Sequence, residues 1–311
     1  MLVEQEVPKL GKKSRLPLNR LFLSVLLFFF CACDLPNKQT RPLVSVDEIS
    51  NLLLRKSGVQ IIDVRHPDEY LSGHIPGAVN IWSREYQIED FHSKEFHINK
   101  FAFENLLGSK GLNARDSIFL YDAKGNYDAA QIWWLLNYYG FDKVALIDGG
   151  LISWQLVKKN LRSGYEDVTP RTFVLVGLEK KELLTNIKGI QHEKFDQIVD
   201  SRSKEEYGGK IIKNGAFRGG HIPGAIWLDH FELMNPNNFQ LKSTDDIRQI
   251  MKTKGLNAHN STVVYGHNEL GSAFAIFVFT EILKMNDVSN YGGSWAEWSE
   301  DESLPIEKAE N

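Results

Sequence analysis

The feature that most constrains this chain is an internal repeat: four blocks of the first half return, in the same order, in the second half. The first-half blocks are IIDVRHPDEY at 61–70, GHIPGAVNI at 73–81, KGLNARDSIFLYD at 110–122 and VALIDGGLISW at 144–154. Their counterparts are IVDSRSKEEY at 198–207, GHIPGAIWL at 220–228, KGLNAHNSTVVYG at 254–266 and VSNYGGSWAEW at 288–298. Such a repeat predicts one fold built twice, and 311 residues are enough for two domains.

The spacing between matched blocks sets the register of the two copies. It grows from 137 residues in the first block to 147 in the second, so the second copy carries an insertion of about ten residues, GKIIKNGAFR at 209–218. In the KGLN block the spacing is 144, which places Gly266 at the position that Asp122 holds in the first copy.

Within each copy, short apolar runs alternate with helix-like stretches. In the first copy we expect strands near 59–63, 78–82, 117–121 and 143–147, with a helix in DAAQIWWLLNYYG that Gly140 terminates. This pattern predicts an α/β fold with a buried, mostly parallel sheet and helices on both faces. Ligands bind such sheets at the carboxyl ends of strands, so the loops that begin at Asp122 and Gly266 are the candidate sites. We expect Asp128 to cap the helix that follows the first loop.

The cysteine content narrows the possible chemistry. The only two cysteines are Cys31 and Cys33. Residues 34–311 can therefore hold no disulfide, no zinc–thiolate site and no thiol nucleophile. The net charge of −4 gives no electrostatic case for nucleic acid. His92 and His97 lack further metal-ligand partners nearby, so we expect neither a metal nor another cofactor.

The N-terminus has the pattern of a targeting segment. Residues 1–20 carry five basic and two acidic side chains, and the uncharged run LFLSVLLFFFCA follows. This run is shorter than the roughly 20 apolar residues of a membrane helix, and its basic flank is typical of a secretory signal. Its end, Phe30-Cys31-Ala32-Cys33, resembles a bacterial lipobox. We therefore expect a lipoprotein signal over 1–32 and lipidation at Cys33, with ordinary cleaved secretion and an uncleaved anchor as alternatives.

Lipidation would place the protein on the extracytoplasmic face of a bacterial membrane, the periplasmic side in a Gram-negative cell. Removal of residues 1–32 changes the net charge to −7. The expected partner is membrane lipid through the N-terminal anchor, with a small anion or a protein partner as further possibilities. We expect a tether over 33–45, a first domain over 46–165, a linker over 166–190 and a second domain over 191–305.

The repeated motifs resemble a known family. IIDVR, EY, GHIPGAVNI and ALIDGGLISW, followed by IVDSR, EY, GGHIPGA and YGGSWAEW, resemble the two domains of a tandem rhodanese over about residues 42–305. This is the thiosulfate and 3-mercaptopyruvate sulfurtransferase family. The resemblance implies two rhodanese-like α/β domains with the active site in the second. It also implies a cysteine at a strand tip, whose thiolate attacks sulfane sulfur and carries it as a persulfide. Loop N–H groups and a helix dipole stabilise that anion.

At that position this chain has no nucleophile. Asp122 occupies it in the first copy and Gly266 in the second, and no thiol follows residue 33. The loop Gly266–Ser272 has seven residues where sulfurtransferase loops have six, and Glu269 would oppose an anion there. We therefore predict a non-catalytic binding or scaffold module. One alternative is a thiosulfate or 3-mercaptopyruvate sulfurtransferase that acts by a cysteine-independent route, and another is new acid–base chemistry at His267, Glu269 or Asp122.

The remaining site predictions concern the second loop and two arginines. The ligand-loop candidates are His267, Asn268, Glu269, Leu270, Gly271 and Ser272, although an exposed polar loop is the simpler interpretation. Gly266 itself would let the backbone turn. Arg202 and Arg218 are candidate anion ligands, but Arg202 with Asp200, like Arg65 with Asp63, also fits a structural salt bridge. His74 and His221, in the two HIPGA turns, are expected to be structural.

Overall fold

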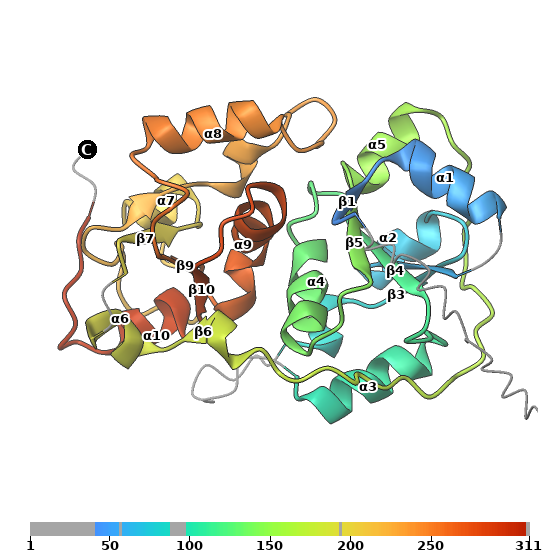
Figure 1. Cartoon of the computed structure of the whole chain (residues 1–311), viewed down its shortest axis with the longest axis horizontal. Helices are drawn as coiled ribbons and strands as arrows, with labels where there is room; N and C mark the ends of the chain where they lie inside the picture. Colours follow the sequence, from blue (N-terminus) through green and yellow to red (C-terminus); the bar gives the residue numbers. More distant parts are fainter. Residues whose placement is uncertain (1–40, 56–57, 88–97, 193–194, 309–311) are drawn as a thin grey trace, which may run out of the picture. The chain divides into compact units, whose positions relative to one another are not determined.

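The computed structural model describes residues 41–55, 58–87, 98–192 and 195–308, which form two α/β domains (Figure 1). The predictions for the signal segment, for lipidation of Cys33 and for His92 and His97 lie outside these residues. Within them, none of the helices combines the length and the apolar character that a membrane crossing requires.

Each domain is built on a five-stranded parallel sheet, and the two sheets have the same strand order. The first sheet runs β1-β5-β4-β2-β3 and the second β6-β10-β9-β7-β8. The first-domain strands are β1 (Leu43–Val44), β2 (Val59–Asp63), β3 (Ala78–Asn80), β4 (Ser117–Tyr121) and β5 (Val144–Ile147). The second-domain strands are β6 (Leu184–Thr185), β7 (Gln197–Asp200), β8 (Ile226–Trp227), β9 (Thr262–Tyr265) and β10 (Val288–Tyr291). The duplicated α/β fold and the four strands expected in the first copy are confirmed.

Helices connect the strands. In the first domain they are α1 (Val46–Leu54), α2 (Pro67–Ser72), η1 (Ser83–Glu85), α3 (Lys100–Ser109), α4 (Ala129–Tyr138) and α5 (Gly150–Leu156). From the linker onward they are η2 (Lys181–Leu183), α6 (Ile187–His192), α7 (Lys204–Tyr207), η3 (His230–Leu233), α8 (Thr244–Thr253), η4 (Glu269–Ser272), α9 (Ala273–Phe277) and α10 (Ser294–Glu300). A π-helical turn, η5 (Val278–Ile282), extends α9.

Alternation along the buried strands explains why helices cover both faces of the first sheet. Ile62 and Leu120 belong to a core that includes residues of α3 and α4, whereas their neighbours Ile61 and Phe119 belong to one that includes residues of α1 and α5. Successive strand side chains point to opposite faces, so an uninterrupted apolar run supplies both cores. The larger core continues into the second domain, where Trp133 of α4 meets Phe277 of α9 edge to face at 5.0 Å between ring centroids.

The HIPGA turns are structural in both domains, as the sequence suggested. His74 Nδ1 lies 3.0 Å from the Tyr70 carbonyl, and the imidazole stacks on the Tyr70 ring. His221 has the same two contacts with Tyr207. Each histidine also pairs, by an antiparallel backbone bridge, with the segment that follows its domain, at Arg162 and Glu307 respectively. The turns therefore fasten the linker and the C-terminal segment to the domains.

Candidate functional site

The two candidate loops lie where the sequence placed them, at the carboxyl ends of β4 and β9. Both strands are central in their sheets, between β5 and β2 in one case and between β10 and β7 in the other. Asp122 directly follows β4 and Gly266 directly follows β9. A short connection leads from each to a buried helix, α4 or α9. The same arrangement of central strand, short loop and buried helix is thus present in both domains.

In the first loop, the Asp122 carboxylate fills the cradle of backbone N–H groups. It accepts hydrogen bonds from the backbone N–H groups of Lys124, Asn126, Asp128 and Ala129 at 2.7–3.2 Å. Burial and the Asp128 carboxylate raise the pKa of Asp122 above its ordinary value, while several of these N–H bonds oppose that rise. The loop is therefore an anion cradle that is already occupied by a side chain of the chain itself.

The start of α4 is capped by Asp122 and not, as the sequence predicted, by Asp128. Asp128 stands at the N-cap position of α4, but its side chain makes no capping hydrogen bond. Asp122 accepts from the N–H groups at the start of the helix instead. Asp122 is buried at the strand tip, and from there its side chain reaches the start of the helix across the loop. The spacing of residues along the sequence did not reveal this contact.

In the second loop, the space for a side chain at position 266 is taken by backbone. A Cβ atom on Gly266 would lie 2.7 Å from the carbonyl carbon of Gly271 and 2.9 Å from the Ser272 nitrogen. The expectation that glycine serves to turn the backbone is wrong, because Gly266 does not adopt a positive φ. Glycine is needed here because the loop folds back against the strand tip.

Position 294, which contacts the strand tip, also differs between the two domains. Its counterpart in the first domain is Gly150, and both residues are in the left-handed region, with φ of 52° at Gly150 and 51° at Ser294. The Ser294 hydroxyl oxygen accepts a hydrogen bond from the Gly266 N–H at 3.2 Å, and the hydroxyl donates to the Tyr291 carbonyl. In the first domain the strand tip carries a side chain, Asp122, and the second position is a glycine, Gly150. In the second domain the strand tip is the glycine and the second position, Ser294, carries the side chain.

The second half of this loop is buried, which corrects the interpretation of an exposed polar loop. Glu269, Leu270, Gly271 and Ser272 are all buried. The Ser272 hydroxyl donates to Asn290 Oδ1 at 2.6 Å, and the Asn290 amide donates to the Glu269 carbonyl at 2.9 Å. Asn290 lies on β10, so the sheet itself holds the loop closed. Asn268 caps the turn of η4 by accepting from the Gly271 N–H.

His267 is held at the start of this loop by the ten-residue insertion. Its Nε2 lies 2.9 Å from the Asn214 carbonyl oxygen, and its Nδ1 lies 3.9 Å from Glu206 Oε1. Glu206 in turn binds Lys213 of the insertion at 2.8 Å. Burial lowers the pKa of His267 below its ordinary value, and Lys213 and Arg202 act in the same direction, while the Asn214 bond and Glu206 oppose them.

The lowered pKa of His267 predicts a pH dependence of stability. The unfolded chain binds the proton more tightly, so the stabilising contribution is complete above the unfolded pKa of about 6.5 and is lost as pH falls through the lower folded value. We expect His267→Gln to weaken the fall in the free energy of unfolding below about pH 6.5. Urea titrations across this range measure it, with His259→Gln, at an exposed histidine, as the control. Parallel pH profiles of wild type and His267→Gln would contradict the prediction.

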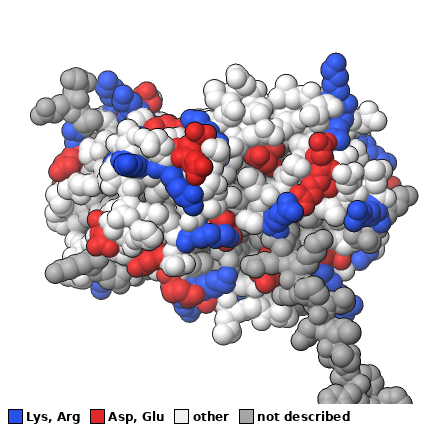
Figure 2. Space-filling model, turned by 45° about the horizontal axis from the view of Figure 1, so that its top comes forward, with Lys and Arg blue, Asp and Glu red and all other residues white. Residues whose placement is uncertain are grey.

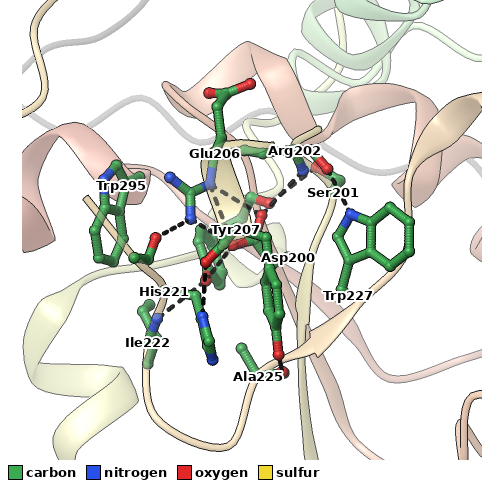
Figure 3. A network of polar contacts seen from close by, with 12 residues as sticks. Asp200, Ser201, Arg202, Glu206, Tyr207, His221, Ile222, Ala225, Trp227 and Trp295 are labelled. Carbon is green, nitrogen blue, oxygen red and sulfur yellow. Dashed lines mark hydrogen bonds and ion pairs between the residues drawn. The ribbon is translucent and has the colours of Figure 1, made fainter. Parts of the chain in front are cut away.

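Arg202 is bound within the second domain (Figure 3). Its guanidinium donates three hydrogen bonds to Asp200, two from Nε at 3.0 and 3.2 Å and one from Nη2 at 2.6 Å, and Nη2 also donates to the Gly220 carbonyl at 2.7 Å. The guanidinium also lies over the Trp295 ring, 4.4 Å from its centroid. The Tyr265 hydroxyl donates to the same carboxylate at 2.6 Å. Arg65, Asp63 and Tyr121 repeat this network in the first domain. A structural role is therefore visible for Arg202, and its anion-binding role stays a prediction.

Arg218 is also engaged by the protein. Its guanidinium donates to the backbone carbonyls of Trp298, Ser299, Asp301 and Leu304 at 2.6–3.0 Å. These contacts join the insertion to the end of α10 and the segment after it. In this arrangement Arg218 binds neutral carbonyl oxygens, so an anion ligand would have to displace them. Both arginines contact Trp295: the Arg202 guanidinium lies over its ring, and the Arg218 carbonyl accepts from its indole N–H at 3.0 Å.

Sequence reasoning missed Tyr127, which lies between the two loops. It belongs to the first loop, yet its hydroxyl lies 3.4 Å from the position that a Cβ on Gly271 would take. Its ring contacts His230 of η3, with 4.3 Å between centroids. Burial, and the nearby Asp128, Glu206 and Asp229 carboxylates, raise the pKa of Tyr127 well above its ordinary value. The repeat places no tyrosine at the matching position of the second copy, so alignment of the two halves gave no signal.

On the face shown in Figure 2, basic and acidic side chains are interspersed. Across the described ranges, no group of three or more His, Cys, Asp or Glu side chains could hold a metal ion.

A cavity of about 270 Å³ in the first domain is lined by Tyr70, Trp82, Tyr165 and Glu166, among others. Neither loop contributes to its lining.

Comparison with known proteins gives this architecture a family. The sequence model of the rhodanese-like domain family matches residues 45–156 and 180–301 of this chain. The thiosulfate sulfurtransferase of Corynebacterium glutamicum is 31% identical over 254 residues, which cover 78% of this chain and 82% of that protein. The sulfur carrier protein TtuD of Thermus thermophilus is 30% identical over 257 residues, with 78% and 87% covered.

Solved structures agree on the fold. The chain superposes on SseA of Escherichia coli, described as a 3-mercaptopyruvate sulfotransferase, with a TM-score of 0.69 and 24% identity over 83% of this chain and all of that one. It superposes on EanB in complex with ergothioneine with a TM-score of 0.75 and 22% identity, over 88% of this chain and 71% of that one. The family model matches both domains, the two parallel sheets have the same strand order, and relatives exceed 30% identity. This chain therefore belongs to the rhodanese-like sulfurtransferase family, with the domain present twice.

Proposed function

We propose that this protein is a non-catalytic member of its family, a membrane-tethered binding or scaffold module. The observation that carries the proposal is the strand tip at Gly266, where a side chain at the nucleophile position would collide with the loop backbone. The absence of cysteine after residue 33 supports it independently. Sulfane-sulfur transfer through a persulfide needs a thiolate in the folded domain. A glycine has no side chain that could act as the nucleophile in its place.

Acid–base chemistry at the loops has less support. A general acid or base must reach the proton it transfers within hydrogen-bond distance. Asp122 already accepts four backbone N–H groups, and Glu269 is buried. His267 contacts the insertion through Asn214. These contacts favour loops that are structural remnants of an active site.

One observation favours the alternative of a sulfurtransferase acting by an unidentified route. A relative at 31% identity is named a thiosulfate sulfurtransferase. Family names of this kind follow overall similarity, whereas activity depends on a few atoms at the site. The alternative would need a sulfur carrier outside the two strand-tip positions.

A turnover assay separates these two functions. We expect the protein without residues 1–33 to form no thiocyanate from cyanide with either thiosulfate or 3-mercaptopyruvate, beyond a heat-inactivated control. The truncation removes only residues that precede the described part of the chain, and within that part every strand and helix lies between residues 43 and 300. Turnover clearly above the control would establish the alternative and remove the non-catalytic proposal.

The membrane tether is tested separately, on the full chain. Cells that express it are labelled with palmitate, and the label should appear on the wild-type protein and on Cys31→Ser but disappear in Cys33→Ser. Two acyl chains with a glyceride would anchor the protein stably, since a single chain gives only marginal binding. Label that persists in Cys33→Ser would refute lipidation at that cysteine.

A further inference from the structure

The linker between the two domains carries the most exposed apolar side chains of the described chain. Residues 171–179 run extended alongside α3 (Figure 1). Val176 is 94% exposed and Leu178 is 89% exposed, and Val174 is also exposed. We call residues 171–181 the strap; they comprise this extended segment, Lys180 and the first residue of η2. Isolated exposed apolar residues are ordinary, but a contiguous group of them marks an interaction surface.

The strap is held firmly, so this exposure belongs to the folded state. The Arg171 N–H donates to the Gly108 carbonyl, and the Leu175 N–H donates to Glu104 Oε1 at 2.7 Å. Lys100 Nζ donates to the Gly177 carbonyl at 2.7 Å. These three contacts follow α3 from its C-terminal to its N-terminal end. The strap is therefore a fixed edge of the first domain.

Alternation along the strap sorts its side chains into two sets. Phe173 and Leu175 are buried, and Phe173 packs near Phe141 with 5.8 Å between ring centroids. The residues between and after them, Val174, Val176 and Leu178, therefore point away from the domain, because side chains of an extended segment alternate. Core packing explains the first set and leaves the second without a function inside the chain.

A further aromatic residue lies on the same flank. Phe101 of α3 is 72% exposed. It precedes Glu104 by one helical turn, and Glu104 contacts the strap at Leu175. Residues three apart in a helix share a face, so Phe101 lies beside the strap near the end that Lys100 holds. Three aliphatic side chains and one aromatic side chain thus form one apolar edge.

The charges around this edge identify the partner. Residues 100–104 and 171–181 hold four basic side chains, Lys100, Arg171, Lys180 and Lys181, against two acidic ones, Glu104 and Glu179. Glu104 accepts from the strap backbone, Lys100 donates to it, and Lys180 donates to Asn137 Oδ1. Lys181 is 80% exposed and lies 3.9 Å from Glu179 Oε2, which leaves Arg171 and Lys181 as the basic side chains at the surface of this border. The rest of the chain is acidic, with a net charge of −4 overall. An apolar edge with a basic border is complementary to a bilayer that contains anionic lipid.

We infer that the strap is a lipid-contacting edge: Val174, Val176, Leu178 and Phe101 enter the interfacial region of a bilayer, and the basic border contacts anionic headgroups. Burial of such side chains is favourable in proportion to their apolar area. Each Lys or Arg near an anionic surface adds a further electrostatic contribution that salt screens. This contact does not depend on acylation of Cys33, because the strap belongs to the folded first domain.

The test uses protein without residues 1–40 and sedimentation with large vesicles, either pure phosphatidylcholine or an equal mixture with phosphatidylglycerol. We expect wild type to bind the anionic vesicles, and we expect Val176→Glu/Leu178→Glu to bind them at least about tenfold more weakly. The matched control is Leu54→Glu, because Leu54 is a leucine of α1 that is 79% exposed; it should bind like wild type. Thermal unfolding of each variant checks that the fold is retained.

A second pair of variants addresses the charges. Arg171→Gln/Lys181→Gln should weaken binding to the anionic vesicles roughly tenfold and leave binding to phosphatidylcholine unchanged. Absence of wild-type binding to anionic vesicles, or equal binding by Val176→Glu/Leu178→Glu, would overturn the inference. A dimeric wild type that this variant makes monomeric, without vesicle binding, would show that the edge contacts a second copy instead. Failure of any arm leaves the non-catalytic proposal intact, because the thiocyanate assay uses neither vesicles nor these residues.

Discussion

Gly266→Cys is expected to be destabilised and to gain no sulfurtransferase activity. The new Cβ would meet the backbone of Gly271 and Ser272 below 3.0 Å, and backbone cannot move aside as a flexible side chain can. Overpacking of a buried site costs about 1–3 kcal/mol. Denaturant unfolding measures the loss, and the thiocyanate assay measures activity. We therefore expect that a cysteine at the strand tip does not restore activity in this chain, because loop backbone occupies the space around it.

Two variants separate the causes in this experiment. Gly266→Ala introduces the same Cβ without a thiol, so it should lose nearly the same stability. Gly292→Ala is the matched control, since its Cβ would find its nearest heavy atom at 3.5 Å, an ordinary contact. A Gly266→Cys protein that is as stable as wild type and forms thiocyanate would show that the loop opens, and the closed cradle would then be no barrier to catalysis.

Arg202→Met is expected to lower the free energy of unfolding by about 3–5 kcal/mol, because it leaves the fully buried Asp200 carboxylate without its charged partner. The Tyr265 hydroxyl and the backbone N–H of residue 202 would still donate to that carboxylate, but neither carries a charge. Urea titration measures the loss. The control is Arg248→Met, since Arg248 forms an exposed pair with Asp245, and exposed pairs contribute about 0–1 kcal/mol.

The double variant Arg202→Met/Asp200→Asn tests the stated cause. Removal of the second charge should restore part of the lost stability, because the penalty arises from an uncompensated buried charge. An Arg202→Met protein within about 1 kcal/mol of wild type would mean that the network is not structural. The candidate role of Arg202 as an anion ligand would then gain support, because the residue would be dispensable for folding.

Much of the fold could be predicted because its determinants are local or repeated. Apolar runs of strand length gave the positions of β2, β4 and β5, and the duplicated motifs gave a second copy of the sheet. The site could be located for the same reason, since the spacing of 144 residues aligned Gly266 with Asp122. The roles of several polar side chains could not be assigned, because they depend on partners far away in sequence. Arg218 contacts carbonyls about 80 residues later, for example.

What the sequence by itself determined is the family resemblance, the double domain and the missing thiol, because motif order and residue identity are properties of the chain. Only the tertiary structure decided how the empty position is filled. It showed that the Asp122 carboxylate occupies one cradle, that backbone and Ser294 close the other, and that Val176 and Leu178 lie outward on a fixed strap. These outcomes depend on the distances between segments that folding brings together, and no local pattern encodes such distances.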